Sequence, residues 1–418
     1  MARKLAKRAA KKGAKKAEKV PIPLLLRDDG EAVAIMEPML VSESSPRRAK
    51  IAELAFELTQ ASAAFRASLP AGLIGPLADL VRSMNCYYSN LIEGHNTHPI
   101  DIERAIHNDL SSDPKKRDLQ LEAKSHIAVQ RWIDEGNLDG REVTIEGLFE
   151  IHRQFASLLP AELLWVEDPN TGRRAIVVPG EQRTLDTKVG QHVAVSPGAI
   201  PRFMKRFEEV YGSLGKFERV LAAGPAHHRL LWIHPFADGN GRVTRLMSYA
   251  TLRSALDTGG LWSVSRGLAR KVSDYKTHLA NCDLPRRNDL DGRGHLSEEA
   301  LVAFSQFFLE ICLDQVRFME SLMQPKALRE RMLRWAEEEI SYGNLPAQAP
   351  RVLDAILFKG SLPRSEVGAV INQSDRTARG VTTALSKEGI VFSAGGHADW
   401  QIAFPAKLAP RLMPGLFP

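Results

Sequence analysis

Hydrophobic residues recur at the three- and four-residue spacing of an amphipathic helix over most of this chain. The pattern is clear in residues 46–92, with AKIAELAFELTQASAAF and PLADLVRSMNCYYSNLI. It returns in residues 142–320, with VTIEGLFEIHRQFASLL and SEEALVAFSQFFLEICLDQVRFM. Residues at this spacing line one face of a helix, so each segment is expected to bury one side against its neighbours. The pattern predicts a mainly α protein.

A single stretch departs from this periodicity. Residues 173–198, RRAIVVPGEQRTLDTKVGQHVAVSPG, alternate β-branched residues with Gly and Pro. This alternation between turn residues is typical of short strands. We expect one β-hairpin here, lying on the helical body.

The pattern changes again in the last part of the chain. A charged helix is expected within residues 323–349, ending at the linker-like sequence NLPAQAP. Residues 350–405 then predict three helices and a hairpin, with helices at 351–359, 364–371 and 374–390 and strands in IVFSA and WQIAF. This order is typical of a winged helix-turn-helix domain. Residues 406–418 are expected to form a C-terminal tail.

The third helix of this predicted domain carries two arginines near its start. Arg376 and Arg379 are three positions apart, where a recognition helix contacts bases or phosphates. Ala378, Val381 and Leu385 are expected to face the core. Basic and acidic residues nearly balance in this domain, so DNA binding and a protein-interaction or dimerisation role stand as alternatives.

Composition narrows the class of protein. The chain has 418 residues, 44% hydrophobic and 25% charged, which is typical of a globular protein of two or three domains. Its three cysteines, Cys86, Cys282 and Cys312, are far apart and suggest neither a disulfide framework nor a zinc site. A reducing, cytoplasmic compartment is therefore expected. No apolar run is long enough for a membrane span, so no membrane partner is expected.

The positive charge is concentrated at the N-terminus. The net charge is +6, but residues 1–20 alone hold nine Lys/Arg and one Glu, which leaves a slightly acidic body. A run of this kind is typical of a solvated, disordered tail that attracts phosphate polyanions weakly. The alternative is a dedicated DNA-binding arm.

The most informative stretch is HPFADGNGRVTR, residues 234–245. Its Gly-Asn-Gly turn permits backbone N–H groups to point into one concavity, and the residues that follow predict a helix. A turn at a helix N-terminus attracts phosphate. Arg242 and Arg245 project from one side of the first turn and can hold phosphate oxygens.

Two further side chains of this stretch suit the same chemistry. Asp238 offers a carboxylate where a phosphate-bound Mg2+ needs one. His234 can take a proton from an incoming hydroxyl. The alternative is a plain turn with solvated charges, but six polar or glycine positions agree with one role, which favours a phosphate site.

The stretch resembles the signature of the Fic family, in which His, any residue, Phe, any residue and Asp or Glu precede Gly-Asn-Gly-Arg, two residues and Arg. Every defining position is matched. The resemblance extends over roughly residues 80–320 and implies a Fic-type helical bundle with a β-hairpin flap. It also implies transfer of AMP from ATP, with Mg2+, to a Tyr, Ser or Thr hydroxyl of a target protein.

The family pattern implies a role for each matched residue. His234 is expected to be the general base, Asp238 the Mg2+ ligand, and Phe236 the residue that fixes the loop in the core. The remaining matched positions are expected to bind the phosphates of ATP: Gly239, Asn240, Gly241 and Arg242, with Arg245 at the γ-phosphate.

Two residues outside the motif also fall at family positions. His227 is expected to be a packed structural histidine on the preceding helix. Tyr275 is expected either to line the adenine side of the nucleotide pocket or to belong to the core.

An upstream segment, SNLIEG, completes the resemblance. Ser89 and Glu93 are i, i+4 and share a helix face, and Gly94 is a natural helix end. The segment resembles the inhibitory motif of the Fic family. The resemblance implies that Glu93 pairs with Arg245, so that the γ-phosphate of ATP is displaced and the activity is autoinhibited.

The predicted domains follow from these assignments. A basic tail (1–20) precedes an N-terminal helical region (21–141) with the inhibitory helix at about 80–95, then a Fic core (142–322), a linker helix (323–349) and the winged helix (350–405). Related proteins are often dimers, so a homodimer is an expectation by resemblance.

Three functions stand at this point. The first is an autoinhibited protein adenylyltransferase, for which reverse de-AMPylation is also open. The second is a DNA-binding regulator that uses the Fic body as a nucleotide sensor, against which the intact His234 argues. The third is a toxin-like Fic enzyme that uses a different donor molecule, such as a kinase-like or phosphocholine-transferring relative. The unbroken Gly-Asn-Gly-Arg argues against the kinase-like branch.

Overall fold

The computed structural model describes residues 26–167, 172, 174–396 and 398–417. The basic segment predicted over residues 1–20 lies outside them. Within the described residues the fold is mainly helical, as predicted, with six short strands in three two-stranded sheets. Here too, no helix is both long and apolar enough to cross a membrane.

The first half of the described chain holds six helices and two small hairpins. The helices are α1 (Arg48–Ala67), α2 (Ala71–Ile92), α3 (Pro99–Ile106), α4 (Pro114–Asp134), α5 (Ile145–Ala156) and α6 (Ile200–Gly212). The strands are β1 (Trp165–Glu167), β2 (Arg174–Ile176), β3 (Lys188–Val189) and β4 (His192–Val193).

The second half is almost entirely helical. Its helices are α7 (Lys216–Leu221), α8 (Ala223–Ile233), α9 (Asn240–Leu256), α10 (Ser265–Arg270), α11 (Val272–Cys282), α12 (Glu298–Met323), α13 (Pro325–Ser341), α14 (Ala349–Lys359), α15 (Val367–Ile371), α16 (Asp375–Lys387) and α17 (Ala409–Leu412). The strands β5 (Val391–Phe392) and β6 (Gln401–Ile402) form the third sheet.

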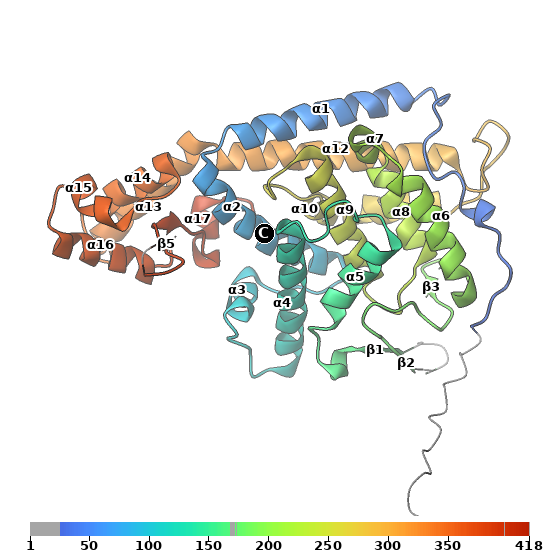
Figure 1. The fold of residues 1–418 in the computed structure, drawn as a ribbon, viewed down its shortest axis with the longest axis horizontal. Coiled ribbons are helices and arrows are strands. Elements are labelled where there is room, and N and C mark those ends of the chain that lie inside the picture. Colours follow the sequence, from blue (N-terminus) through green and yellow to red (C-terminus); the bar gives the residue numbers. More distant parts are fainter. Residues whose placement is uncertain (1–25, 168–171, 173, 397, 418) are drawn as a thin grey trace, which may run out of the picture.

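Two long helices, α1 and α12, run along one edge of the molecule (Figure 1). Figure 1 shows α1 and α12 side by side along one edge, with α13 to α17 at one end and the β1–β2 and β3 region toward the other. Helix α12 begins where the Ser297 side chain accepts a hydrogen bond from the backbone N–H of Ala300, with Glu298 and Glu299 in the first turn. These are favourable residues at a positively polarised helix N-terminus.

The hairpin predicted over 173–198 is wrong in its extent. Strand β2 pairs backward with β1, and a second hairpin joins β3 and β4. Pro179 and Gly180 lie between β2 and β3, and Gly180 has a positive φ of 74°. Because Pro lacks the N–H that a strand ladder uses and Gly180 turns the chain, one continuous hairpin does not form.

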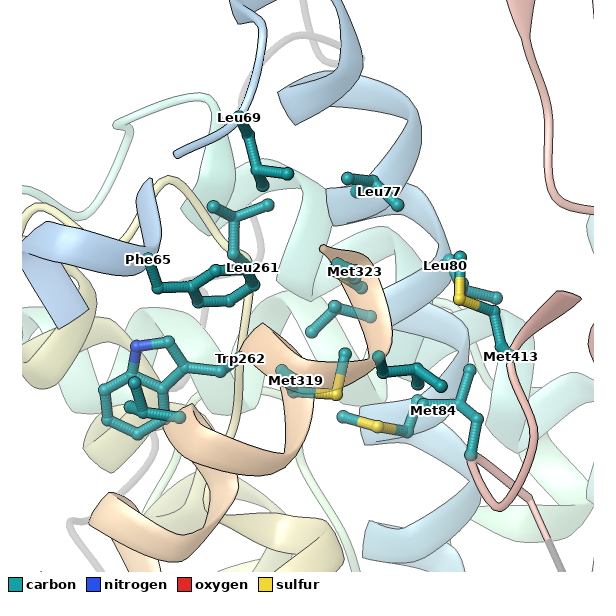
Figure 2. Close-up of a cluster of buried hydrophobic side chains, with 14 of the residues drawn as sticks. Phe65, Leu69, Leu77, Leu80, Met84, Leu261, Trp262, Met319, Met323 and Met413 are labelled. Atoms are coloured by element: carbon teal, nitrogen blue, oxygen red, sulfur yellow. The ribbon is translucent and has the colours of Figure 1, made fainter. Parts of the chain in front are cut away.

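The helix expected within residues 323–349 is present as α13, and both it and the segment expected to be a C-terminal tail are packed against the rest of the described chain. In α13 the apolar face is buried, and Trp335 is only 2% exposed. Residues 406–417 form α17 and its flanks, where Leu412, Met413 and Leu416 are each at most 1% exposed. Figure 2 shows Met413 beside Leu80 and Met84 of α2 in one hydrophobic cluster. The partners of these apolar residues lie far away in sequence.

The three-helix and hairpin order predicted for 350–405 is present as α14, α15, α16 and β5–β6. Ala378, Val381 and Leu385 are buried, as predicted. The module is close to α2, since a Cβ atom built on Gly72 would lie 2.6 Å from the backbone of Gly360. The C-terminal module and α2 therefore share a tight backbone contact.

Candidate active site

The loop that joins α8 to α9 carries the residues of the HPFADGNGRVTR stretch. His234 ends α8 in the left-handed conformation, with φ 52° and ψ 60°, and Gly239 precedes α9 with φ 81°. The Asn240 side chain closes the loop: its Oδ1 accepts from the N–H of Phe236 at 2.9 Å, and its Nδ2 donates to the carbonyl of Phe236 at 2.8 Å. Asn240 thus shapes the loop through its side chain.

Phe236 fixes this loop in the core. It is fully buried, and its ring stacks on His152 of α5 with centroids 4.1 Å apart and planes 6° apart. Nδ1 of His152 accepts a hydrogen bond from the N–H of Gly180 at 2.9 Å. The loop is therefore held between α5 and the segment after β2.

His234 is chemically suited to act as a base. Burial, followed by the charge of Arg183, lowers the pKa of His234 to about 4. The imidazole is therefore neutral at neutral pH and has a nitrogen lone pair that can accept a proton.

The C-terminal end of α2 pairs with Arg245. Arg245 Nη2 forms an ion pair with Oε1 of Glu93, its Nε donates to Oγ of Ser89 at 2.9 Å, and Nη2 also donates to the Ser89 carbonyl at 3.1 Å. Burial would raise the pKa of Glu93, but the charge and hydrogen bond of Arg245 outweigh it and hold the pKa below its ordinary value. Gly94 follows with φ 88°, as suits the residue after a helix.

Gly241 lies in the first turn of α9, directly under this ion pair. A Cβ atom at Gly241 would collide with Oε1 of Glu93 and would lie 3.1 Å from Nη1 of Arg245. A carboxylate therefore already occupies the space above the helix N-terminus. Carboxylates and phosphates both bind favourably at helix N-termini and to arginine. The position therefore fits an anion such as a phosphate of ATP.

Arg242 faces a second carboxylate. Its Nη1 is 3.1 Å from Oε2 of Glu122 on α4, and its Nη2 is 3.3 Å from Oδ2 of Asp238. Glu122 Oε2 also lies 2.8 Å from Nδ1 of His95, and this hydrogen bond raises the pKa of His95. Each arginine of the motif is thus paired with a carboxylate from outside it, Glu93 for Arg245 and Glu122 for Arg242, and Arg242 also pairs with Asp238 within the motif.

Asp238 lies at the rim of the site, with its side chain 49% exposed. A half-exposed carboxylate next to an anion-binding turn fits Mg2+, which takes one or two protein oxygens and completes its shell with phosphate oxygens and water. Asp238 is therefore the residue that would hold the metal.

The remaining predicted residues lie in two places. His227 is fully buried, with its ring nitrogens 2.8 Å from Oγ of Ser248 and 2.7 Å from the Tyr275 hydroxyl. Tyr275 is itself only 2% exposed and belongs to the hydrophobic core. Arg376 and Arg379 are exposed on α16, in the C-terminal module, and take no part in this site.

Four residues around the loop were not predicted from the sequence: His95, Glu122, His152 and Arg183. Each reaches the loop from another element, and none stands in a recognisable spacing to it. Glu122 occurs in PKKRDLQLEAK, where charged residues are frequent, and Arg183 in PGEQRT, where a lone arginine carries no signal. Only the packing of their elements against α9 and its loop identifies them.

Comparison with known proteins agrees with this geometry. A sequence model of the Fic/DOC family matches residues 142–252. Two curated relatives, each called Protein adenylyltransferase Fic, come from Drosophila grimshawi and Drosophila willistoni. They are 30% identical to this chain over 171 residues, which cover 40% of it and 32% and 31% of the relatives. The chain thus spans about a third of the length of these relatives.

Among solved structures, a Fic family protein from Desulfovibrio desulfuricans G20 superposes with a TM-score of 0.51 at 17% identity. The superposition covers 87% of this chain and 98% of that one, and at this identity it shows the fold alone. The molecule is a helical protein with an anion-binding loop at the start of a buried helix. Residues 142–252, which include this loop, match the Fic/DOC family.

Proposed function

We propose that this protein is an adenylyltransferase that moves AMP from ATP to a hydroxyl side chain of a target protein. The observation that carries the proposal is the position of His234, a neutral base, on the same loop as the anion site above Gly241. The names of the Drosophila relatives support the same reaction. Arg245 would bind a phosphate once Glu93 is displaced, and Arg242 would bind a phosphate beside Asp238.

The proposed reaction needs one proton transfer and one exchange at phosphorus. His234 takes the proton of the target hydroxyl, and the hydroxyl oxygen forms a bond to the α-phosphorus of ATP. The bond from the α-phosphorus to the bridging oxygen breaks, and pyrophosphate leaves with the electron pair. Mg2+, held by Asp238, would neutralise charge on the phosphates when bound.

We further propose that Glu93 inhibits this activity within the same chain. Its carboxylate lies above Gly241 and neutralises Arg245, so a triphosphate entering the site competes with it for the same cation. A misplaced γ-phosphate would spoil the in-line alignment of the α-phosphorus. The released state would then require Glu93 to leave Arg245.

The test uses ATP labelled on the α-phosphate, with lysate protein as acceptor. We expect little labelling by the wild-type protein, at least tenfold more by Glu93→Gly, and none by Glu93→Gly combined with His234→Ala. Equal labelling by wild type and Glu93→Gly would contradict the autoinhibition. If Glu93→Gly binds ATP but transfers no label, a nucleotide-sensing role replaces the enzyme.

A further inference from the structure

Arg183 is a buried arginine, and within the described part of the chain its guanidinium donates hydrogen bonds only to backbone carbonyl groups. It is 2% exposed, and its Nε donates to the carbonyl of His234 at 2.8 Å. Its Nη1 donates to the carbonyl of Leu185 at 2.9 Å, and its Nη2 donates to that of Val195. One planar side chain thus joins three separate points of the backbone.

These three points belong to the catalytic loop and to both flanks of one hairpin. Leu185 precedes β3 and Val195 follows β4, so the guanidinium spans the base of the β3–β4 hairpin. The backbone N–H of Arg183 also donates to the carbonyl of Pro235 at 2.8 Å. Arg183 therefore fixes two consecutive carbonyl groups of the loop, those of His234 and Pro235.

The buried guanidinium and the left-handed His234 are both unfavourable for the stability of the fold, which indicates that they serve the site. Burial lowers the pKa of Arg183 to about 10, against the opposing charges of Asp186 and Glu31, and among the described residues neither carboxylate forms an ion pair with it. A buried cation without a carboxylate partner is unfavourable for stability. The conformation of His234, with φ 52°, is also unfavourable for a residue with a side chain and must be held by its surroundings.

A second contact joins the same two segments. Nε2 of His192, in β4, donates to the carbonyl of Trp232 at 2.8 Å, two residues before His234. The hairpin is thus tied to the end of α8 on both sides of the turn that presents the base.

We propose that Arg183 is a positioning residue for AMP transfer, which holds His234 in its left-handed conformation and fixes the base relative to the β3–β4 hairpin. The inference rests on the proposed function. Displacement of a catalytic group by about 1 Å can lower a rate by about 100-fold. Loss of Arg183 should therefore affect the chemical step more than the binding of ATP.

The experiment compares Arg183→Lys and Arg183→Ala in the Glu93→Gly protein. The matched control is Arg229→Lys, because Arg229 is also fully buried and also donates to a backbone carbonyl, that of Pro38. We expect kcat for labelling to fall 10- to 100-fold in both Arg183 variants, with the Kd for ATP within about twofold of the parent. Lysine should not restore kcat, because one ammonium does not reproduce the planar fork. Methylguanidinium should partly restore Arg183→Ala.

Two results would overturn the inference. The first is a kcat in Arg183→Lys equal to that of the parent. The second is an equal loss of kcat in the Arg183 and Arg229 variants, with weaker ATP binding in both. If the Glu93→Gly parent itself transfers no label, the proposed function fails and the inference is decided by NMR. In that case Arg183→Lys should change the chemical shifts and titration of His234, and Arg229→Lys should not. An unchanged His234 signal in both would end the proposal.

Discussion

The Nε of Arg245 donates a hydrogen bond of 2.9 Å to Oγ of Ser89, a residue 156 positions earlier in the chain. This contact holds the last arginine of the loop against α2 through a serine as well as through Glu93. Arg245 is 2% exposed, and its guanidinium bonds both the side chain and the carbonyl of Ser89 in addition to the Glu93 carboxylate.

Ser89→Ala should weaken the autoinhibition only partly. The substitution removes one of the hydrogen bonds to Arg245 but keeps the Glu93 carboxylate, and a net loss of about 1 kcal/mol corresponds to a fivefold shift. We expect labelling from α-labelled ATP to rise about two- to tenfold over wild type, below the rise in Glu93→Gly. Ser83→Ala, on the same helix, is the control. Labelling by Ser89→Ala at the wild-type level would argue against a role for the serine.

Gly241→Ala should weaken ATP binding. A methyl group there occupies the space in which the Glu93 carboxylate now lies, so it displaces the inhibitor and fills the anion site together. In the Glu93→Gly protein we expect at least a tenfold weaker Kd for ATP, measured by calorimetry. Gly380→Ala is the matched control, because Gly380 is also helical and its Cβ would meet nothing within 4 Å. Retained ATP affinity in Gly241→Ala would contradict the assignment.

Stability should fall as the pH falls from 6.5 toward 4. Burial lowers the pKa of His126 to about 3 and those of His152 and His228 to about 4. The folded protein thus binds fewer protons than the unfolded chain below the ordinary histidine pKa, so the stabilisation is complete above pH 6.5 and is lost on acidification. Each such histidine lowers the free energy of unfolding by on the order of 1.4 kcal/mol for each pH unit of acidification within that window.

The measurement is the Tm at pH 7.5 and at pH 5. We expect a clearly lower Tm at pH 5 and a weaker pH dependence in His228→Gln. Substitution of the exposed His107 by Gln should leave the pH dependence unchanged. A Tm that is constant or higher at pH 5 would contradict the proposed protonation states.

Leu416→Ala should destabilise the whole protein, although it lies two residues from the C-terminus. Leu416 is fully buried, and its carbonyl accepts a hydrogen bond of 2.9 Å from the Tyr88 hydroxyl of α2. Truncation of a buried leucine costs about 2–5 kcal/mol, which denaturant unfolding would detect. Phe358→Ala is the control, because Phe358 is 85% exposed and surface changes stay within about 0.5 kcal/mol. If the C-terminal residues were not packed, Leu416→Ala and Phe358→Ala would lower the free energy of unfolding by equally small amounts, which would contradict the prediction.

Local patterns in the sequence determined the helical class, the order of elements in the C-terminal module and the residues of the loop between α8 and α9. They did so because helical periodicity, turn residues and the Gly-Asn-Gly turn are each encoded by neighbouring residues. The ion pair of Glu93 and Arg245 was also predicted, but by resemblance to a family and not by any property of either segment alone.

Tertiary structure alone decided which distant residues surround that loop. Glu122 on α4, His152 on α5 and Arg183 after β2 reach it only because their elements pack against α9 and the end of α8. The same holds for residues 406–417, whose apolar side chains were visible in the sequence but whose partner, α2, was not. Spacing fixes which face of an element is apolar, whereas contacts between elements depend on packing that no local pattern records.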